Sequence, residues 1–266
     1  MALVLMTLHL DAHADYIRRL ISRAASTRLT PNGSCDTGET PPTTASLSGP
    51  EDVNDTGYVD PVENAAFDSE TALSAHLRVS GCYWAMCALE LTGKATDADR
   101  KLAVSIVNEA SVSADFTELA TLMSMKTEKS ERSSKPLDST NCAKRTLAWG
   151  GAHGHDPHLL HTLSAIQVIA MGNALDSIDT DAVATYVALL QNSDGSFCGD
   201  GWGEVDTRFS YCAVATLAII GKLHTIDTQK AVEYLVNCMN FDGGFGSVPH
   251  AESHAGQSMF GFIAAT

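Results

Sequence analysis

The sequence has few basic residues, few aromatic residues and no long apolar run, and each shortage excludes a class of protein. Lys and Arg number 17 against 32 Asp and Glu, a formal net charge of −15, so the surface repels the phosphates of nucleic acids and of acidic lipids. Aromatic residues make up only 6% of the chain, which favours helices over a β-sandwich. We therefore expect a helical protein that does not bind nucleic acid.

Signals for membrane insertion and secretion are also missing. No stretch reaches the roughly 18 apolar residues that a bilayer span needs, and the apolar run at residues 1–10 is too short for a signal peptide and lacks a cleavage site behind it. The 7 cysteines are scattered, with no C-x-x-C pair of the kind that zinc and redox sites use. These features predict a cytoplasmic protein without a transmembrane segment.

Two segments differ in composition from the rest of the chain. Residues 24–69 are rich in Ser, Thr, Pro, Gly and Asn, a composition that buries too little apolar surface to offset its ordering entropy. Residues 111–146 are again polar, although residues 116–125 could form one amphipathic helical stretch. We expect a single domain over residues 1–266 with a disordered insert at 24–69 and a second insert at 111–146.

The C-terminal third contains an internal repeat with a constant period. The turn D-G-S-F at 194–197 matches D-G-G-F at 242–245, and Tyr186 matches Tyr234 at the same spacing. Each copy reads as a helix (182–190; 228–239), a glycine-rich turn and a second helix (207–220; from 254 onward). An earlier copy aligns at a slightly larger offset, which pairs Asp156 with Asp206 and makes its loop shorter by five residues. This pattern predicts an array of helical hairpins.

The two kinds of helix in this array predict two layers. The second helices, such as residues 159–171, are apolar nearly all round, which is typical of helices buried on both sides, whereas the first helices are amphipathic. Hairpins with one buried and one half-exposed member fit an α/α toroid better than an open solenoid. The predicted fold is therefore all-α, an α/α toroid of helical-hairpin repeats with two polar inserts.

Several strings of this chain resemble the β subunits of protein prenyltransferases, in particular that of Rab geranylgeranyltransferase. They are H-D-P-H-L-L at 155–160, W-G-E-V-D-T-R-F-S at 202–210, N-F-D-G-G-F-G at 240–246 and E-S-H-A-G-Q at 252–257. The string L-R-V-S-G-C-Y-W at 77–84 is also similar, while the two inserts are not.

This resemblance implies an activity and a set of partners. It implies an apolar cavity for geranylgeranyl diphosphate and transfer of the geranylgeranyl group to C-terminal cysteines of Rab GTPases, together with a prenyltransferase α subunit and the Rab escort protein. In this family Zn²⁺ deprotonates the acceptor thiol. Two alternatives stay open: a β subunit of type I geranylgeranyltransferase or of farnesyltransferase, and a non-catalytic helical scaffold that binds lipid or a partner.

Four residues are predicted to bind the isoprenyl diphosphate: the resemblance assigns His254, Ala255 and Gly256, and the repeat adds Arg208. The first three stand at the start of a helix that Ser253 would cap, where free N–H groups favour anions; the alternative is a histidine that only bonds to the cap. Arg208 lies at the equivalent point of the preceding copy. It can bind the diphosphate, form an ion pair with Asp206 or Glu252, or do both.

Ser80 and Leu160 are the predicted determinants of lipid length. By resemblance, Ser80, four residues before Trp84, stands where farnesyl-transferring relatives have a bulky tryptophan at the cavity floor, and Leu160 aligns with a tyrosine of those relatives. A small side chain at position 80 leaves room for the longer lipid.

A run of histidines at positions 153, 155, 158 and 161 invites interpretation as a metal site. We favour helix capping and cavity lining instead, because Pro157 fits a first helical turn and Asp156 fits its N-cap. The family's zinc ligands, an aspartate and a cysteine two residues apart and a later histidine, would lie beyond Thr266. We therefore expect an incomplete toroid without metal ligands, and no prenyl transfer by this chain alone.

Overall fold

The computed structural model describes residues 14–19, 21–22, 28–29, 35–36, 74–115 and 145–265, most of them helical. The main elements are α3 (Arg78–Leu91), α4 (Asp97–Glu109), β3 (Ser111–Asp115), β4 (Arg145–Trp149), α6 (Leu159–Met171), α7 (Thr180–Leu189), α8 (Thr207–Ile219), α9 (Thr228–Asn237) and α10 (Ala255–Ala265). Short 3-10 turns precede α3, α7 and α9 at Ala75–Leu77, Leu175–Ser177 and Leu223–Thr225. Within this described part, no helix is long and apolar enough to cross a membrane.

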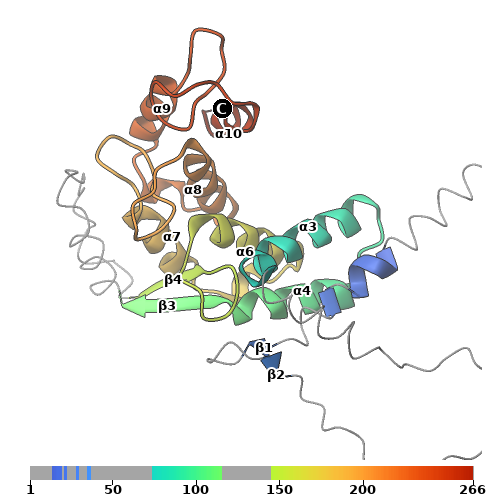
Figure 1. Cartoon of the computed structure of the whole chain (residues 1–266). Coiled ribbons are helices and arrows are strands. Elements are labelled where there is room, and N and C mark those ends of the chain that lie inside the picture. Colours follow the sequence, from blue (N-terminus) through green and yellow to red (C-terminus); the bar gives the residue numbers. More distant parts are fainter. Residues whose placement is uncertain are drawn as a thin grey trace, which may run out of the picture.

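The helices form the two layers that the sequence predicts. The inner helices α3, α6, α8 and α10 pack side by side in that order along an arc, and α4, α7 and α9 lie against them (Figure 1). The outer helix α9 is amphipathic, since Ala231, Leu235 and Cys238 are buried while Gln229 and Glu233 are exposed. Apolar burial against the inner layer therefore holds α9 in place. The prediction of an amphipathic outer helix is wrong for α7, because residues 182–187 are all buried where this helix also packs against β4.

The repeat has the same period in all three copies. The inner helices α6, α8 and α10 begin at equal intervals, at Leu159, Thr207 and Ala255, and the outer helices α7 and α9 begin at Thr180 and Thr228 with the same spacing. The larger offset predicted for the first copy is therefore wrong, because the equivalent of Asp206 is His158 and not Asp156. The loop before α6 is not shortened either. His158 N donates to the Trp149 carbonyl, and in the third copy His254 N donates to the Phe245 carbonyl across the same number of residues.

One backbone hydrogen bond recurs between neighbouring repeats. An N–H in the first turn of an inner helix donates to a turn carbonyl of the next repeat, in the pairs Val79 to Gly151 (3.0 Å), Leu159 to Gly199 (2.7 Å) and Thr207 to Ser247 (2.9 Å). The first N–H groups of a helix have no partner inside the helix. The array therefore satisfies them by stacking one repeat on the next.

Short antiparallel strands lie within or beside the two predicted inserts. In β3 and β4, Ser111 is opposite Trp149 and Asp115 is opposite Arg145, so both ends of the predicted insert at 111–146 are paired as strands. Inside the predicted insert at 24–69, β1 (Arg28–Leu29) pairs with β2 (Cys35–Asp36). The remaining residues of both inserts lie outside the described ranges.

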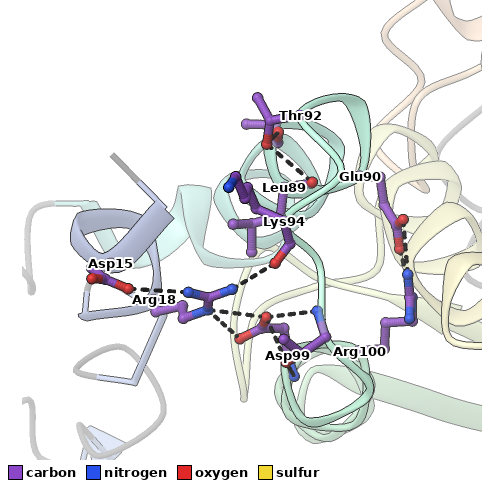
Figure 2. A network of polar contacts seen from close by, with 10 residues as sticks. Asp15, Arg18, Leu89, Glu90, Thr92, Lys94, Asp99 and Arg100 are labelled. Carbon is purple, nitrogen blue, oxygen red and sulfur yellow. Dashed lines mark hydrogen bonds and ion pairs between the residues drawn. The ribbon is translucent and has the colours of Figure 1, made fainter. Parts of the chain in front are cut away.

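The helical segment at residues 14–19 is attached to the α3–α4 hairpin by Arg18 (Figure 2). Its Nε donates to both carboxylate oxygens of Asp99 at 3.1 Å, and its Nη2 donates to the carbonyl of Lys94. Asp99 also closes the capping box of α4, in which Thr96 N donates to Asp99 Oδ2 (2.9 Å) and Asp99 N donates to Thr96 Oγ1 (3.2 Å). Burial acts to raise the pKa of Asp99, but the hydrogen bonds from Thr96 and Arg18 hold it below its usual value.

Candidate functional site

The predicted substrate-binding residues lie at the N-terminal ends of the inner helices. Ser80 is in the first turn of α3, Leu160 in that of α6 and Arg208 in that of α8, while His254 immediately precedes α10. Because these helices pack side by side, the residues form a row along one edge of the inner layer. We name this edge the rim: Ser80, Leu160, Arg208 and residues 254–256.

Three inner helices begin with the same side-chain cap. His158 Nδ1 accepts from Leu160 N (3.1 Å), Asp206 Oδ1 accepts from Arg208 N (2.8 Å), and His254 Nδ1 accepts from Gly256 N (3.1 Å). The three capping residues recur at the period of the repeat. An imidazole nitrogen therefore caps α6 and α10, and a carboxylate oxygen caps α8.

Two predicted caps are wrong. Asp156 does not cap α6, because that helix begins three residues later and His158 is its N-cap. Ser253 does not cap α10, since its hydroxyl donates to Asp242 Oδ1 (2.7 Å) in the preceding turn. The regular spacing of positions 158, 206 and 254 could have identified the caps, but the larger offset predicted for the first copy concealed it.

Arg208 forms the ion pair that was one of its predicted roles. Its Nε and Nη2 donate to Asp206 Oδ1 (2.9 Å) and Oδ2 (3.0 Å), so the guanidinium is held by both carboxylate oxygens. Asp206 is buried, whereas the Arg208 side chain is 39% exposed and lies over the ring of Phe209. The hydrogen bonds that Arg208 donates to Asp206 raise the pKa of Arg208. The rim thus has a permanent cation with a fixed direction and an exposed surface.

The first turns of α8 and α10 are joined by Gln257. Its Nε2 donates to Asp206 Oδ2 (3.1 Å), and its Oε1 accepts from Thr207 Oγ1 (2.7 Å). This amide brings the predicted diphosphate residues of the two helices, Arg208 and residues 254–256, next to each other. Sequence reasoning gave Gln257 no role.

At the other end of the rim, Ser80 contacts His161, a member of the histidine run for which we predicted capping and cavity lining. Ser80 Oγ is 3.1 Å from His161 Nδ1, across the α3–α6 interface. The ring of His161 meets that of His158 edge-on at a centroid distance of 5.8 Å, and His158 meets Phe209 at 5.3 Å. Ser80 and Arg208 are therefore linked by a continuous series of ring contacts along the rim.

Burial, followed by the charges of the nearby His158, His155 and His76, lowers the pKa of His161 to about 4. The pKa of His158 is also lowered, mainly by burial. At neutral pH both rings are uncharged, so Arg208 provides the permanent positive charge in this row.

The described residues do not fit the zinc site of the family. Among them, no group of three or more His, Cys, Asp and Glu side chains could hold a metal ion. Burial raises the pKa of Cys212 to about 12 and that of Cys238 to about 11, which disfavours the thiolates that zinc binds. His153 is also drawn away from the histidine run, since its Nδ1 is 3.0 Å from the carbonyl of Glu109.

A surface cavity of about 690 Å³ lies at the opposite ends of α3 and α6 from the rim. Its lining residues are Glu90, Asp97, Arg100, Lys101, Met171, Gly172 and Asn173. Arg100 is already bound to Glu90 at 2.6 Å and 3.0 Å and to Asp97 at 2.9 Å. Its charge is therefore compensated within the cavity, which contains none of the predicted substrate-binding residues.

Comparison with known proteins identifies the family. The model for the prenyltransferase alpha-alpha toroid domain matches residues 54–266. The chain is 33% identical to the geranylgeranyl transferase type-2 subunit beta of Saccharomyces cerevisiae over 211 residues, which is 76% of this chain and 53% of that protein. It is also 33% identical to the subunit of the same name from Candida albicans, over 70% of this chain and 48% of that protein.

A solved structure has the same fold. The Candida albicans protein geranylgeranyltransferase-I complexed with GGPP matches with a TM-score of 0.50 at 17% identity, over 73% of this chain and 53% of that chain. The chain spans about half the length of the curated relatives that it matches. The all-α toroid predicted from the repeat is confirmed, and so is the resemblance to prenyltransferase β subunits. The chain belongs to the prenyltransferase alpha-alpha toroid domain family.

Proposed function

We propose that this chain is the lipid-binding part of the β subunit of a Rab geranylgeranyltransferase. In that role it binds geranylgeranyl diphosphate, and the whole enzyme transfers the geranylgeranyl group to C-terminal cysteines of Rab GTPases with an α subunit and the Rab escort protein. The observation that carries the proposal is the rim, where an oriented arginine stands beside the first turn of α10.

The charged end of the lipid is assigned to the α8–α10 side of the rim. Arg208 has a permanent charge, and its side chain is fixed by Asp206 but remains 39% exposed. A diphosphate that accepts hydrogen bonds from a fixed guanidinium gains more than it would from a freely moving cation. His254 and Ala255 supply further polar groups at the start of α10, and Gly256, whose N–H donates to His254 Nδ1, holds the imidazole in place.

The hydrocarbon tail then runs along the rim toward α3. Packed helix axes are about 8–10 Å apart, so the two steps from α8 through α6 to α3 cover about 16–20 Å. Leu160 and Ser80 lie on this path, and the histidine rings beside them are neutral. An uncharged wall suits an isoprenoid chain, because burying hydrocarbon next to a charge would desolvate that charge.

In this proposal the described residues bind and orient the lipid but do not activate the acceptor thiol. In the family, Zn²⁺ lowers the pKa of that thiol, which is about 8.5 without a metal. We assign no zinc ligand to the described residues. The expectation that this chain alone transfers no prenyl group therefore remains a prediction.

Two other functions stay open. A β subunit of type I geranylgeranyltransferase or of farnesyltransferase would use the same rim, and the structural neighbour is an enzyme of the former type. A non-catalytic scaffold would bind the lipid or an α subunit without supporting transfer. Lipid preference separates farnesyltransferase from both geranylgeranyl enzymes, and the acceptor protein separates type I from type II.

The test begins with binding. The full chain is purified with a type-2 α subunit, and the affinities for geranylgeranyl and farnesyl diphosphate are measured by calorimetry. We expect the longer lipid to bind more tightly, and Arg208→Ala to weaken both lipids about tenfold to a hundredfold. Arg100→Ala is the matched control, since Arg100 is also ion-paired but lies at the far end of the inner helices. Equal losses in the two variants, or a preference for farnesyl diphosphate, would contradict the proposal.

The second part of the test is transfer. Zinc content and transfer to a Rab–escort complex are measured on the same preparation. We expect little bound zinc and no turnover. Stoichiometric zinc with multiple turnovers would show that the metal site has been assigned wrongly, and the histidines at positions 153–161 would be the first to substitute.

A further inference from the structure

We propose that His161 is a specificity-determining residue for lipid length and that it acts as a unit with Ser80. The inference rests on the proposed function and adds to it, because only Ser80 and Leu160 were expected to set the length. The observation behind it is the 3.1 Å contact between Ser80 Oγ and His161 Nδ1, which places an imidazole where a small residue was expected to leave room.

The ring of His161 is confined on three sides. Ser80 holds Nδ1 from α3, and the ring of His158 meets it edge-on at 5.8 Å. On the third side lies the loop before α6, so close that a Cβ atom added to Gly151 would come within 3.1 Å of His161 Nε2. A ring confined in this way is a wall rather than a mobile surface side chain.

The space available beside α3 therefore depends on two residues. The small side chain of Ser80 lets α3 and α6 leave a position between their first turns, and the imidazole of His161 occupies it. Removing the ring lengthens the space for the lipid tail beside α3 by about the size of the ring, whereas a larger ring shortens that space. Burial keeps the imidazole neutral, so it can contact hydrocarbon without the desolvation of a charge.

The test compares three lipids that differ by one isoprene unit: farnesyl, geranylgeranyl and geranylfarnesyl diphosphate. Their dissociation constants are measured by calorimetry with the full chain. His161→Ala is expected to raise the affinity for geranylfarnesyl relative to geranylgeranyl diphosphate by about tenfold, since a pocket distinguishes small differences in hydrocarbon length by factors of this order. His161→Trp is expected to move the preference the other way, toward farnesyl diphosphate.

Gln167→Ala is the matched control. Gln167 also joins α6 to α3, through a 3.1 Å hydrogen bond from its Nε2 to Tyr83 OH. It lies six residues after His161, which is about 9 Å further along α6. Breaking this second contact weakens the same helix pair away from the rim, so the order of the three affinities is expected to stay as in the wild type.

The outcomes separate this inference from the proposed function. If the wild-type chain binds none of the three lipids, the proposed function is overturned and the role of His161 with it. If the wild type binds geranylgeranyl diphosphate but His161→Ala and His161→Trp leave the affinity ratios unchanged, only the role of His161 is overturned. The same holds if Gln167→Ala shifts the ratios as much as His161→Ala. Circular dichroism checks that each variant is folded, and His161→Asn, a smaller residue that keeps a polar group near Ser80, replaces any variant that is not.

Discussion

Gly195 and Gly243 occupy the same place in successive repeats, yet we expect alanine to be tolerated very differently at the two positions. Both glycines have a positive φ, +92° and +79°, which costs an L-residue about 1–2 kcal/mol. At Gly195 an added Cβ would also overlap the backbone carbonyl of Lys230, which belongs to α9 of the next repeat. At Gly243 nothing lies within 4 Å of the added atom.

These surroundings set the expected magnitudes. Gly243→Ala should lower the free energy of unfolding by about 1–2 kcal/mol, the conformational cost alone. Gly195→Ala adds an overpacking cost of about 1–3 kcal/mol, because backbone cannot move aside as a flexible side chain can, so the total is about 2–5 kcal/mol. Urea unfolding followed by far-UV circular dichroism measures both changes, with the slope m unchanged if only stability is affected.

Each substitution is the control for the other, since both place alanine in the same kind of turn. The two sites differ in that the backbone of α9 lies against Gly195, whereas nothing lies within 4 Å of the atom added at Gly243. Equal losses of stability would mean that α9 does not pack on the turn at Gly195. The proposed packing of one repeat on the next would then be wrong.

Three further predictions concern buried polar groups. Asp99→Asn should lower the free energy of unfolding by about 1 kcal/mol at neutral pH, because it weakens the α4 capping box and the contact with Arg18. The pKa of Asp99 is lowered in the fold, so this contribution to stability is lost as the pH falls below about 4. Urea unfolding at pH 7 and pH 3 measures the difference. Because the pKa of His161 is about 4, its imidazole should stay neutral down to about that pH in an NMR titration. The free energy of unfolding should fall from about pH 6.5 downward, because the unfolded chain binds a proton that the native ring does not. His161→Asn should remove that part of the pH dependence. Asp206→Ala removes a cap, an ion pair and the bond from Gln257, and should cost about 2–4 kcal/mol in urea unfolding, whereas Asp206→Asn keeps the cap and should cost less.

The fold could be predicted from the sequence because its signal is periodic. The helix expected at residues 159–171 is observed with those bounds, and the turn at 194–197 recurs one period later. Hydrophobic patterning also separates the outer helix α9 from the inner helices, since burial on one side leaves a direct trace in the residue types. It does not separate α7, in which residues 182–187 are all buried.

The candidate site was harder to predict, because its contacts depend on side-chain chemistry between distant segments. Histidine is an unusual helix cap, so Asp156 was the more natural choice for α6 although His158 takes the role. The contact between Ser80 and His161 joins residues 81 positions apart, and no local pattern indicates it. Repeat spacing identifies equivalent positions, but not which side chains meet across the inner layer.

The central claim is that an isoprenyl diphosphate lies along the rim, with its charged end at α8 and α10 and its tail beside the first turns of α6 and α3. The most direct test is photo-crosslinking with a geranylgeranyl diphosphate analogue that carries a photoreactive group at the tail end, followed by mass spectrometry of the labelled peptides. The account predicts labelling around Ser80 and residues 160–161, competed by geranylgeranyl diphosphate and weakened by Arg208→Ala. Competed labelling confined to α9, or to the cavity lined by Glu90 and Arg100, would contradict it.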